Sequence, residues 1–377
     1  MAVSRINEAG LNVNQYGNRR LNINGAMQVA QRGAARTVSD GGAEGYQTLD
    51  RWYALFSSSA GGVATISQDT TVPSGYGFGS SYKVDVATAD TSIAADHAIT
   101  IQYRFEAQDI VNSGWDYTNS NSNMSVSFWA RSVKAGTYCV FFYTGDGTLK
   151  SLVQEYTLEA DTWKYVTLRF KGDSGISFNN DNGLGLTVGW TLVAGTDRYQ
   201  SVTAGTWIDK TSGNGQARYA TSNQVNFFDN TANNFFLTGV QIEVGDTATD
   251  FEHRSYGDEL QRCFRYYYRM SCDGTHDGVY SIGNAYTTDD AVAAISLPVA
   301  MRTEPTLGYQ TGSTGHRIRT GAGQSQQTSS LSISSFDNTN FTNLGFHGVT
   351  TTTNLTIGQA AQFRLSVNDF IDFDSEL

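Results

Sequence analysis

The chain has 377 residues, enough for two or three domains that each bury a core of their own. Its 39 glycines, only 3 prolines and 12% aromatic residues are typical of short strands joined by turns, so an all-β protein is expected. A formal net charge of -11 argues against a general nucleic-acid binder, because that role needs a basic face to offset phosphate charge.

Residues 1–36 differ from the rest of this acidic chain, because they hold five arginines and a single glutamate. We interpret residues 1–44 as an N-terminal arm that is either partly disordered or anchors the protein to a larger assembly. The arginines expected to anchor it are Arg5, Arg19 and Arg20. The segment has no apolar stretch typical of a signal peptide, and no run of 18 apolar residues occurs in the chain. Synthesis in a cytoplasm and no membrane partner are therefore expected.

Residues 45–252 repeat strand patterns separated by turn residues, which predicts a two-sheet antiparallel sandwich of the jelly-roll type. Within one such run Met124, Val126 and Phe128 alternate with small polar residues. The same alternation places Trp129 on the more solvent-facing surface of its sheet or under a covering loop. The clearest runs are 81–88, 99–107, 124–132, 138–145, 163–170, 184–193 and 235–244.

The hydrophobic period changes from two to three and four after the last of these strands. An apolar stripe of Tyr256, Leu260, Phe264 and Tyr267 predicts a short amphipathic helix. A stripe of this size on so short a segment must be covered, since an isolated helix of about a dozen residues is marginal in water. We therefore expect these side chains to form a contact between modules or between subunits.

Residues 271–377 follow this linking segment of 253–270 and are predicted to form a smaller, β-sandwich-like module. Runs at 279–286, 291–299 and 362–374 have strand patterns. The polar, low-complexity stretch 311–335 is either a long exposed loop or a hairpin.

Motifs of catalysis and of metal binding are missing from the sequence. It contains no G-x-S-x-G, H-E-x-x-H or P-loop pattern, so we expect no enzymatic activity and no catalytic residues. Cys139, Cys263 and Cys272 show no C-x-x-C spacing and are expected to be ordinary reduced or buried thiols. Turns at 145–148, 179–183 and 229–234 are rich in oxygen ligands but lack EF-hand spacing, which leaves calcium open and no cofactor expected.

Two polar loops carry aromatic residues of the kind that binds sugars. A pyranose presents apolar C–H patches ringed by hydroxyls, so an aromatic face with amides nearby suits it. The candidate glycan-binding residues are Trp115, Tyr117, Tyr199, Trp207 and Asn214. The alternative interpretation is that these rings shield the ends of the sheets.

Five stretches resemble phage virion proteins of the tail-fibre or appendage kind. They are RRLNINGAMQVAQRG (19–33), TLDRWYA (48–54), GVQIEVGDTATDFEHRSYGDELQRCFRYYYR (239–269), SLPVAMRTEPTL (296–307) and the tail DFDSEL. The resemblance covers nearly the whole chain and implies a carbohydrate-binding-module-like jelly roll in its centre. It further implies a non-enzymatic virion component that attaches to host-surface glycans, contacts other virion proteins and forms a homo-oligomer, most simply a homotrimer.

The same resemblance allows two other functions. One is a capsid or tail decoration protein, or a head (capsid) fibre, without receptor binding. The other is a polysaccharide-degrading tailspike, since a glycosidase needs only two carboxylates held about 5–10 Å apart.

Overall fold

The computed structural model describes residues 19–39, 44–57, 61–210, 215–272, 274–309, 315–321, 325–334 and 342–377. The chain divides into two compact units, Met1–Glu259 with Leu377, and Leu260–Glu376. Nearly all regular structure is β-strand, which confirms the predicted all-β class. Among the helices in the described ranges, none has the length and apolarity needed to cross a bilayer.

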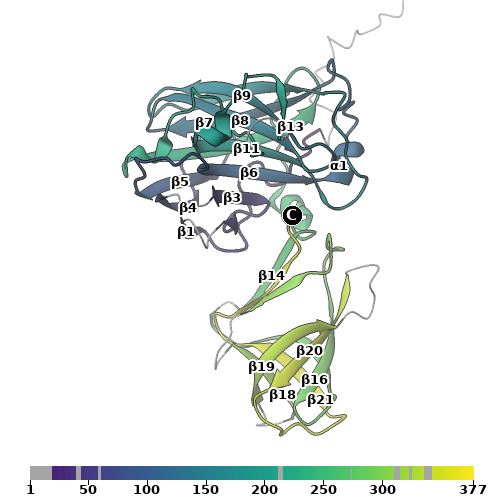
Figure 1. Cartoon of the computed structure of the whole chain (residues 1–377). Coiled ribbons are helices and arrows are strands. Elements are labelled where there is room, and N and C mark those ends of the chain that lie inside the picture. The colour runs from purple at the N-terminus through teal and green to yellow at the C-terminus, as the bar shows by residue number, and fades with distance from the viewer. Residues whose placement is uncertain are drawn as a thin grey trace, which may run out of the picture. The chain divides into compact units, whose positions relative to one another are not determined.

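The first unit is an antiparallel sandwich of two stacked sheets (Figure 1). All seven runs that the sequence predicted as strands are strands of this sandwich. The six-stranded sheet has the order β1 (Ala35–Ser39), β4 (Val63–Asp69), β5 (Ser81–Thr88), β13 (Asn234–Val244), β7 (Asn123–Ser132) and β10 (Lys164–Lys171). The seven-stranded sheet has the order β12 (Trp207–Asp209), β9 (Lys150–Leu158), β8 (Gly136–Thr144), β11 (Leu184–Ala194), β6 (Ala98–Glu106), β3 (Trp52–Ser57) and β2 (Gly45–Tyr46). Short helices α1 (Ala107–Val111), α2 (Thr196–Tyr199) and η3 (Phe227–Asp229) lie in the connections.

Aromatic side chains fill the space between the two sheets. Because successive side chains of a strand point to opposite faces, each strand contributes every second residue to this core. The ring of Trp52 lies 5.5 Å from Trp190, 5.6 Å from Tyr103 and 6.5 Å from Tyr82, measured between centroids. Burying such rings supplies a large share of the apolar area that holds the sheets together.

Residues 19–39 belong to this sandwich, which corrects that part of the N-terminal arm predicted over residues 1–44; residues 1–18 and 40–43 lie outside the described residues. Met27 is fully buried in the core, and β1 pairs with β4. The Asn22 amide donates to the carbonyl of Val240 and accepts from the N–H of Ile242, both at 2.9 Å. The charge of the segment suggested a free arm, but Asn22 satisfies buried backbone groups of β13, and an unpaired buried backbone group is costly.

Of the three arginines proposed for anchoring, Arg20 is part of the same correction, whereas anchoring by Arg19, whose side chain is 29% exposed, stays a prediction. Arg20 is 3% exposed and forms an ion pair with Glu259, while the Nε of Arg19 lies 3.5 Å from a carboxylate oxygen of Glu243. Arg20 is therefore a core residue and is not available to a partner. Arg5 lies outside the described residues.

Helix α3 (Tyr256–Cys263) forms within the predicted linking segment, but its buried face differs from the prediction. Ser255 caps it, since its hydroxyl accepts from the N–H of Asp258 at 3.2 Å. Its buried residues are Glu259 and Cys263, whereas Tyr256 is 57% exposed and Leu260 is half-buried. The large apolar residues predicted the wrong buried face, because the side chain that α3 buries most deeply besides Cys263 is the carboxylate of Glu259.

Phe264 and Tyr267, the other two members of the predicted stripe, lie beyond the end of α3. The ring of Phe264 packs edge-on against Tyr268 at 4.9 Å, and Tyr267 is buried at the start of strand β14. A contact of these residues between modules or subunits stays a prediction.

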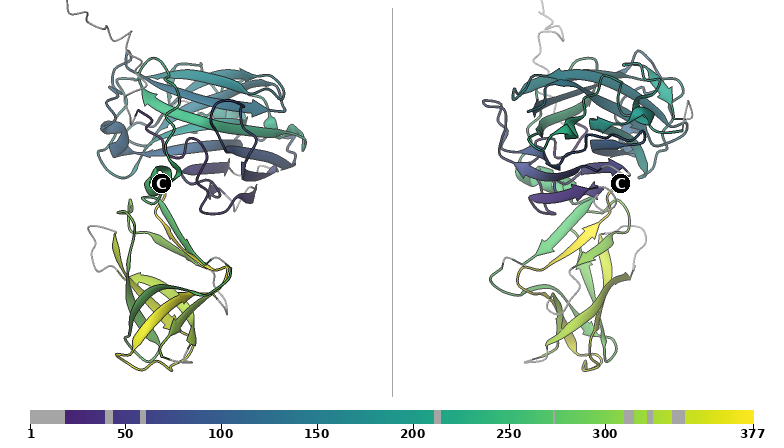
Figure 2. Two further views of the ribbon diagram at one scale, coloured as in Figure 1. Left: turned by 180° about the vertical axis from the view of Figure 1, so that it is seen from behind. Right: turned by 60° about the vertical axis from the view of Figure 1, so that its left-hand side comes forward.

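The second unit contains a closed six-stranded barrel, where the sequence predicted a sandwich-like module. The order round the barrel is β15 (Gly278–Ala285), β16 (Asp290–Ser296), β20 (Asn343–Thr350), β19 (Ser325–Ser334), β18 (His316–Arg319) and β21 (Ala360–Leu365). Figure 2 shows these green to yellow strands wrapping round one another. Small inward residues such as Ala285, Ala291 and Ala361 let the strands close into a cylinder, since a narrow barrel has room for few large side chains.

A three-stranded sheet completes this unit, with the order β14 (Tyr267–Ser271), β22 (Phe370–Asp374) and β17 (Thr306–Tyr309). Arg269 and Asp372 face each other across β14 and β22 and form two hydrogen bonds of 2.6 Å. Within the low-complexity stretch, β18 pairs with β19, so the hairpin alternative holds for the part that the structure describes.

The three cysteines are free thiols, and Cys139 is expected to resist alkylation in the folded protein. Burial raises the pKa of the Cys139 thiol to about 11, so at pH 8 only about one thiol in a thousand is ionised. Iodoacetamide at pH 8 should modify Cys139 only after denaturation, as followed by peptide mass spectrometry, with half-buried Cys272 as the internal comparison. Equal labelling rates at the two positions would contradict this.

Candidate functional site

The aromatic residues proposed from the sequence as sugar ligands do not form one site. Trp115 is only 3% exposed, and its indole N–H donates to the carbonyl of Ser122 at 3.3 Å. It is therefore a core residue, which corrects its proposed role as a surface platform. Half-buried Tyr117 packs on Trp115, with ring centroids 6.2 Å apart.

Tyr199 and Trp207 lie in different places on the seven-stranded sheet: Tyr199 covers its outer face, whereas Trp207 lies in the edge strand β12 and packs against the main core. Tyr199 packs on a small cluster that includes Cys139 and Phe141. Trp207 pairs with β9, and its indole N–H donates to the carbonyl of Lys171 at 2.8 Å. Asn214 lies outside the described residues. These rings have packing partners, as in the shielding interpretation, and glycan binding by Tyr199 or Trp207 stays a prediction.

A different row of aromatic rings lies on the outer face of the six-stranded sheet. It consists of Tyr76, Trp129 and Tyr165, and we call it the aromatic row. Ring centroids are 4.3 Å apart between Tyr76 and Trp129 and 5.4 Å apart between Trp129 and Tyr165. Tyr76 is 54% exposed and Tyr165 is 42% exposed, so the row presents aromatic surface to solvent.

Strand register sets two members of this row. Trp129 of β7 and Tyr165 of β10 are direct cross-strand partners, and cross-strand neighbours on one face have Cβ atoms about 4.5–5.5 Å apart. Phe128 and Val166, their neighbours in sequence, are buried in the core. Alternation therefore forces Trp129 and Tyr165 to the outer face.

The third member, Tyr76, reaches the row from the loop between β4 and β5. Gly75 and Gly77 on either side of it have positive φ values of 86° and 75°, which few other residues adopt. The next residue, Phe78, fixes the loop by packing against Phe251 at 5.0 Å and against the ring of His253 at 5.2 Å.

A glycine in β13 makes room for that anchor. Gly239 has a φ of +60° and lies where β13 bulges relative to β7. A Cβ at this position would lie 2.5 Å from Cζ of Phe78, which is closer than a carbon contact allows. The Gly239 bulge therefore allows Phe78 to pack, and Phe78 holds Tyr76 over Trp129.

A second aromatic pair, Phe236 and Trp163, lies next to the aromatic row on the same outer face. Phe236 of β13 faces Arg131 of β7, whose guanidinium lies 5.3 Å from the ring centroid of Phe236. Trp163, just before β10, lies 6.1 Å from Phe236 between ring centroids. It also lines a pocket of about 260 Å³ whose polar side chains come from Thr157, Glu159, Thr162 and Lys164.

Polar groups surround the aromatic row. The pKa of Tyr165 is raised above its ordinary value, mainly by burial and further by the charges of Glu243 and Asp250, while a hydrogen bond with Ser127 acts in the opposite direction. The phenol is therefore neutral at physiological pH and can both donate and accept a hydrogen bond. Rings bordered by hydroxyls and charged groups can bind a ligand that has apolar and polar faces.

Metal binding finds no support in the described ranges, where no group of three or more His, Cys, Asp or Glu side chains could hold an ion. The turns considered for calcium are closed by their own hydrogen bonds. Asp146 accepts from the backbone N–H of Asn179 at 3.0 Å and from its amide at 2.8 Å. Asp229 accepts from the Asn233 amide at 2.9 Å and pairs with Lys134 at 2.6 Å.

Comparison with known proteins gives similarity to solved structures alone. No protein-family model and no curated protein matches the chain. One similar structure is a protein of Bacteroides thetaiotaomicron whose assignment as sugar-binding is provisional. It aligns with 12% identity over 60% of this chain and 100% of its own length, with a TM-score of 0.32. A carbohydrate-binding module of family 4 (CBM4) aligns with 12% identity, 59% of this chain, 98% of its own and a TM-score of 0.30.

A third similar structure is the C-terminal family 22 carbohydrate-binding module of a Clostridium thermocellum protein. It aligns with 13% identity over 52% of this chain and 88% of its own, with a TM-score of 0.29. The description of the sandwich rests on the strand order and register of this chain. The chemistry of a ligand is inferred from the side chains on its surface.

Proposed function

We propose that this protein binds glycans through the aromatic row, as a non-enzymatic component of a bacteriophage particle that takes part in attachment to the host surface. The observation that carries the binding function is the row itself: Tyr76, Trp129 and Tyr165 in contact on one face and partly open to solvent. Sequence resemblance to phage appendage proteins supports the place on a virion.

The chemistry of the row suits a neutral stretch of polysaccharide. Aromatic faces pack against the axial C–H groups of a pyranose, while the Tyr165 hydroxyl and neighbouring side chains can bond its hydroxyls. Stacking of one flat ligand unit on one ring contributes about 1–3 kcal/mol, on the scale known for nucleobases. Three rings in contact thus provide room for more than one sugar along the face.

Buried carboxylates of the sandwich have structural partners, which favours binding over hydrolysis. Asp50 accepts from the N–H of Gln31 at 3.0 Å, and Glu243 accepts from the N–H of Thr249 at 2.7 Å. We also propose a homotrimer located on the virion that contacts other virion proteins, as the resemblance implies. The rival decoration protein or head fibre would share the fold and have no glycan ligand.

Alanine at Trp129 is expected to weaken glycan binding by about 1–3 kcal/mol, because it removes the central ring of the row. Binding would be measured on a glycan array and then by calorimetry with the full chain. Tyr76→Ala and Tyr165→Ala should each have a smaller effect in the same direction. Tyr256→Ala is the matched control, since Tyr256 is an exposed tyrosine of α3 that has no part in the aromatic row.

Two results would decide against the proposal. Wild-type protein that binds no glycan on the array would favour the decoration protein, whereas release of reducing sugar from a bound glycan would favour the tailspike. Binding that survives Trp129→Ala and Tyr76→Ala unchanged would move the site away from the aromatic row.

A further inference from the structure

Three arginines point outward from two adjacent strands of the C-terminal barrel. Arg317 and Arg319 alternate on β18 with Ile318, which is buried, and Arg364 alternates on β21 with Phe363, which is also buried. Arg317 and Arg364 are direct cross-strand partners, and Arg319 pairs in the same register with Gln362. We call these three residues the arginine cluster.

This arrangement is unfavourable for the barrel alone. Like charges directly opposite each other on neighbouring strands destabilise a sheet. In the part of the chain that the structure describes, none of the three arginines has a carboxylate within ion-pairing distance, and the Nε atoms of Arg317 and Arg364 are buried without a hydrogen-bond acceptor. Arg364 donates at 3.5 Å to the carbonyl of Asp277. Two other arginines of the same unit have closer partners, since Arg269 pairs with Asp372 at 2.6 Å and Arg302 donates at 2.7 Å to the carbonyls of Ser375 and Glu376.

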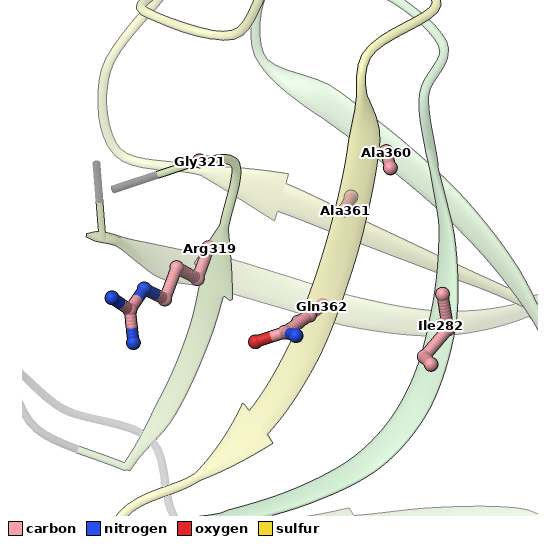
Figure 3. A pocket seen from close by; sticks show the side chains of 6 residues that line it. All are labelled: Ile282, Arg319, Gly321, Ala360, Ala361 and Gln362. Carbon is pink, nitrogen blue, oxygen red and sulfur yellow. The ribbon is translucent and has the colours of Figure 1, made fainter. Parts of the chain in front are cut away.

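A pocket of about 490 Å³ lies beside the arginine cluster. It is lined by Arg319 and Gln362, by the 69% exposed Ile282, and by the small residues Gly321, Ala360 and Ala361. Figure 3 shows the side chains of Arg319 and Gln362 on neighbouring strands, with the Gln362 amide extending toward the side of Arg319, and Ile282 on the strand beyond. The small residues leave an open floor between a cationic wall and an apolar one.

We propose that the arginine cluster and this pocket form a second binding site, specific for an acidic polysaccharide. The carboxylate or sulfate groups of the polysaccharide would accept hydrogen bonds from the guanidinium groups of Arg317, Arg319 and Arg364. A guanidinium donates in a planar fork that matches the geometry of both anions. The Gln362 amide bonds a sugar hydroxyl, and Ile282 packs against a ring face. This site is separate from the aromatic row, and it would stand even if the proposed function failed.

The test uses the full chain and a matched pair of polymers, dextran sulfate and uncharged dextran, in calorimetry at low and high salt. Dextran sulfate should bind and dextran should not bind at this site, with affinity falling as salt screens the charges. Polygalacturonate separates a carboxylate preference from a sulfate preference. Each of Arg319→Gln and Arg364→Gln should raise the Kd for dextran sulfate about tenfold, on the scale of one charge-assisted hydrogen bond.

Two controls keep the test specific. Arg36→Gln removes an exposed arginine of β1 in the sandwich and should leave the Kd unchanged. Trp129→Ala should also leave it unchanged, which distinguishes this site from the aromatic row.

Stability gives an independent readout of the role of the cluster. Arg364→Gln removes the like-charge pair, so hydrogen exchange of β18 and β21 in the free protein should slow or stay unchanged while the binding of dextran sulfate falls. A purely structural arginine would behave in the opposite way, with faster exchange in the variant.

Three outcomes would overturn the proposal. They are no binding of either acidic polymer, a Kd that is unaffected by the barrel variants, and faster exchange of β21 in Arg364→Gln. A single-stranded DNA probe that binds more tightly than the acidic polysaccharides, with the same dependence on the arginines, would assign the site to nucleic acid instead.

Discussion

Replacing Glu259 by glutamine is expected to destabilise the sandwich by about 3–5 kcal/mol, the cost of removing one partner from a buried ion pair. Glu259 is 1% exposed, forms an ion pair with Arg20 and accepts from the backbone N–H of Asn24. Its carboxylate also lies 3.5 Å from a guanidinium nitrogen of Arg254. Without the negative charge, the buried Arg20 guanidinium would lose its compensating partner.

Tryptophan fluorescence in a denaturant titration measures this loss for the sandwich alone, because all six tryptophans lie between residues 52 and 207. Glu159→Gln, an exposed carboxylate of the same unit, should shift the midpoint little. Arg20→Met should cost about as much as Glu259→Gln. If both variants unfold at the wild-type midpoint, the N-terminal segment does not depend on this ion pair.

Gly239→Ala is expected to cost about 2–5 kcal/mol, from two separate causes. An L-residue in the left-handed region costs about 1–2 kcal/mol, and crowding a packed aromatic ring costs about 1–3 kcal/mol. The added methyl group would push on Phe78, whose neighbour Tyr76 belongs to the aromatic row. Glycan affinity should therefore fall together with stability.

The matched control is Gly257→Ala, another glycine-to-alanine change in the same unit. Gly257 lies in α3 with open space where a Cβ would be placed, and alanine favours helix by about 1 kcal/mol. Its stability should stay equal or rise in the same fluorescence titration. A wild-type midpoint for Gly239→Ala would show that Phe78 can move without cost.

Strand content was predictable because alternation is a local property. The outward side of Trp129 follows from its own neighbours, and the structure places it there. Its partners were not predictable in the same way: Tyr165 joins it through strand register, and Tyr76 through a loop whose conformation depends on Gly239. Neither relation can be read from a single stretch of sequence.

The errors have a common physical cause, which is the use of charge and polarity as signs of exposure. Arg20 was expected to be available to a partner because charged residues are rarely buried, but its ion pair with Glu259 lies in the core. Trp115 was assigned to a polar loop, yet its ring turns inward onto Phe142. Helix α3 forms inside the segment where a helix was expected, but the residues it buries are Glu259 and Cys263 and not the predicted apolar stripe.

The contacts of residues 19–25 with β13 and α3 also determine when the sandwich can finish folding during synthesis. Asn22 bonds Val240, and the Arg20 ion pair must wait for Glu259, so the first described residues of the sandwich need almost the last ones. At about 5–20 residues per second, a ribosome takes roughly 12–48 s to add the intervening stretch. During that time the strands already made have exposed edges and aromatic surface. A chaperone that binds nascent chains should therefore remain on this protein until α3 emerges, while the barrel, built from later residues, is still being made.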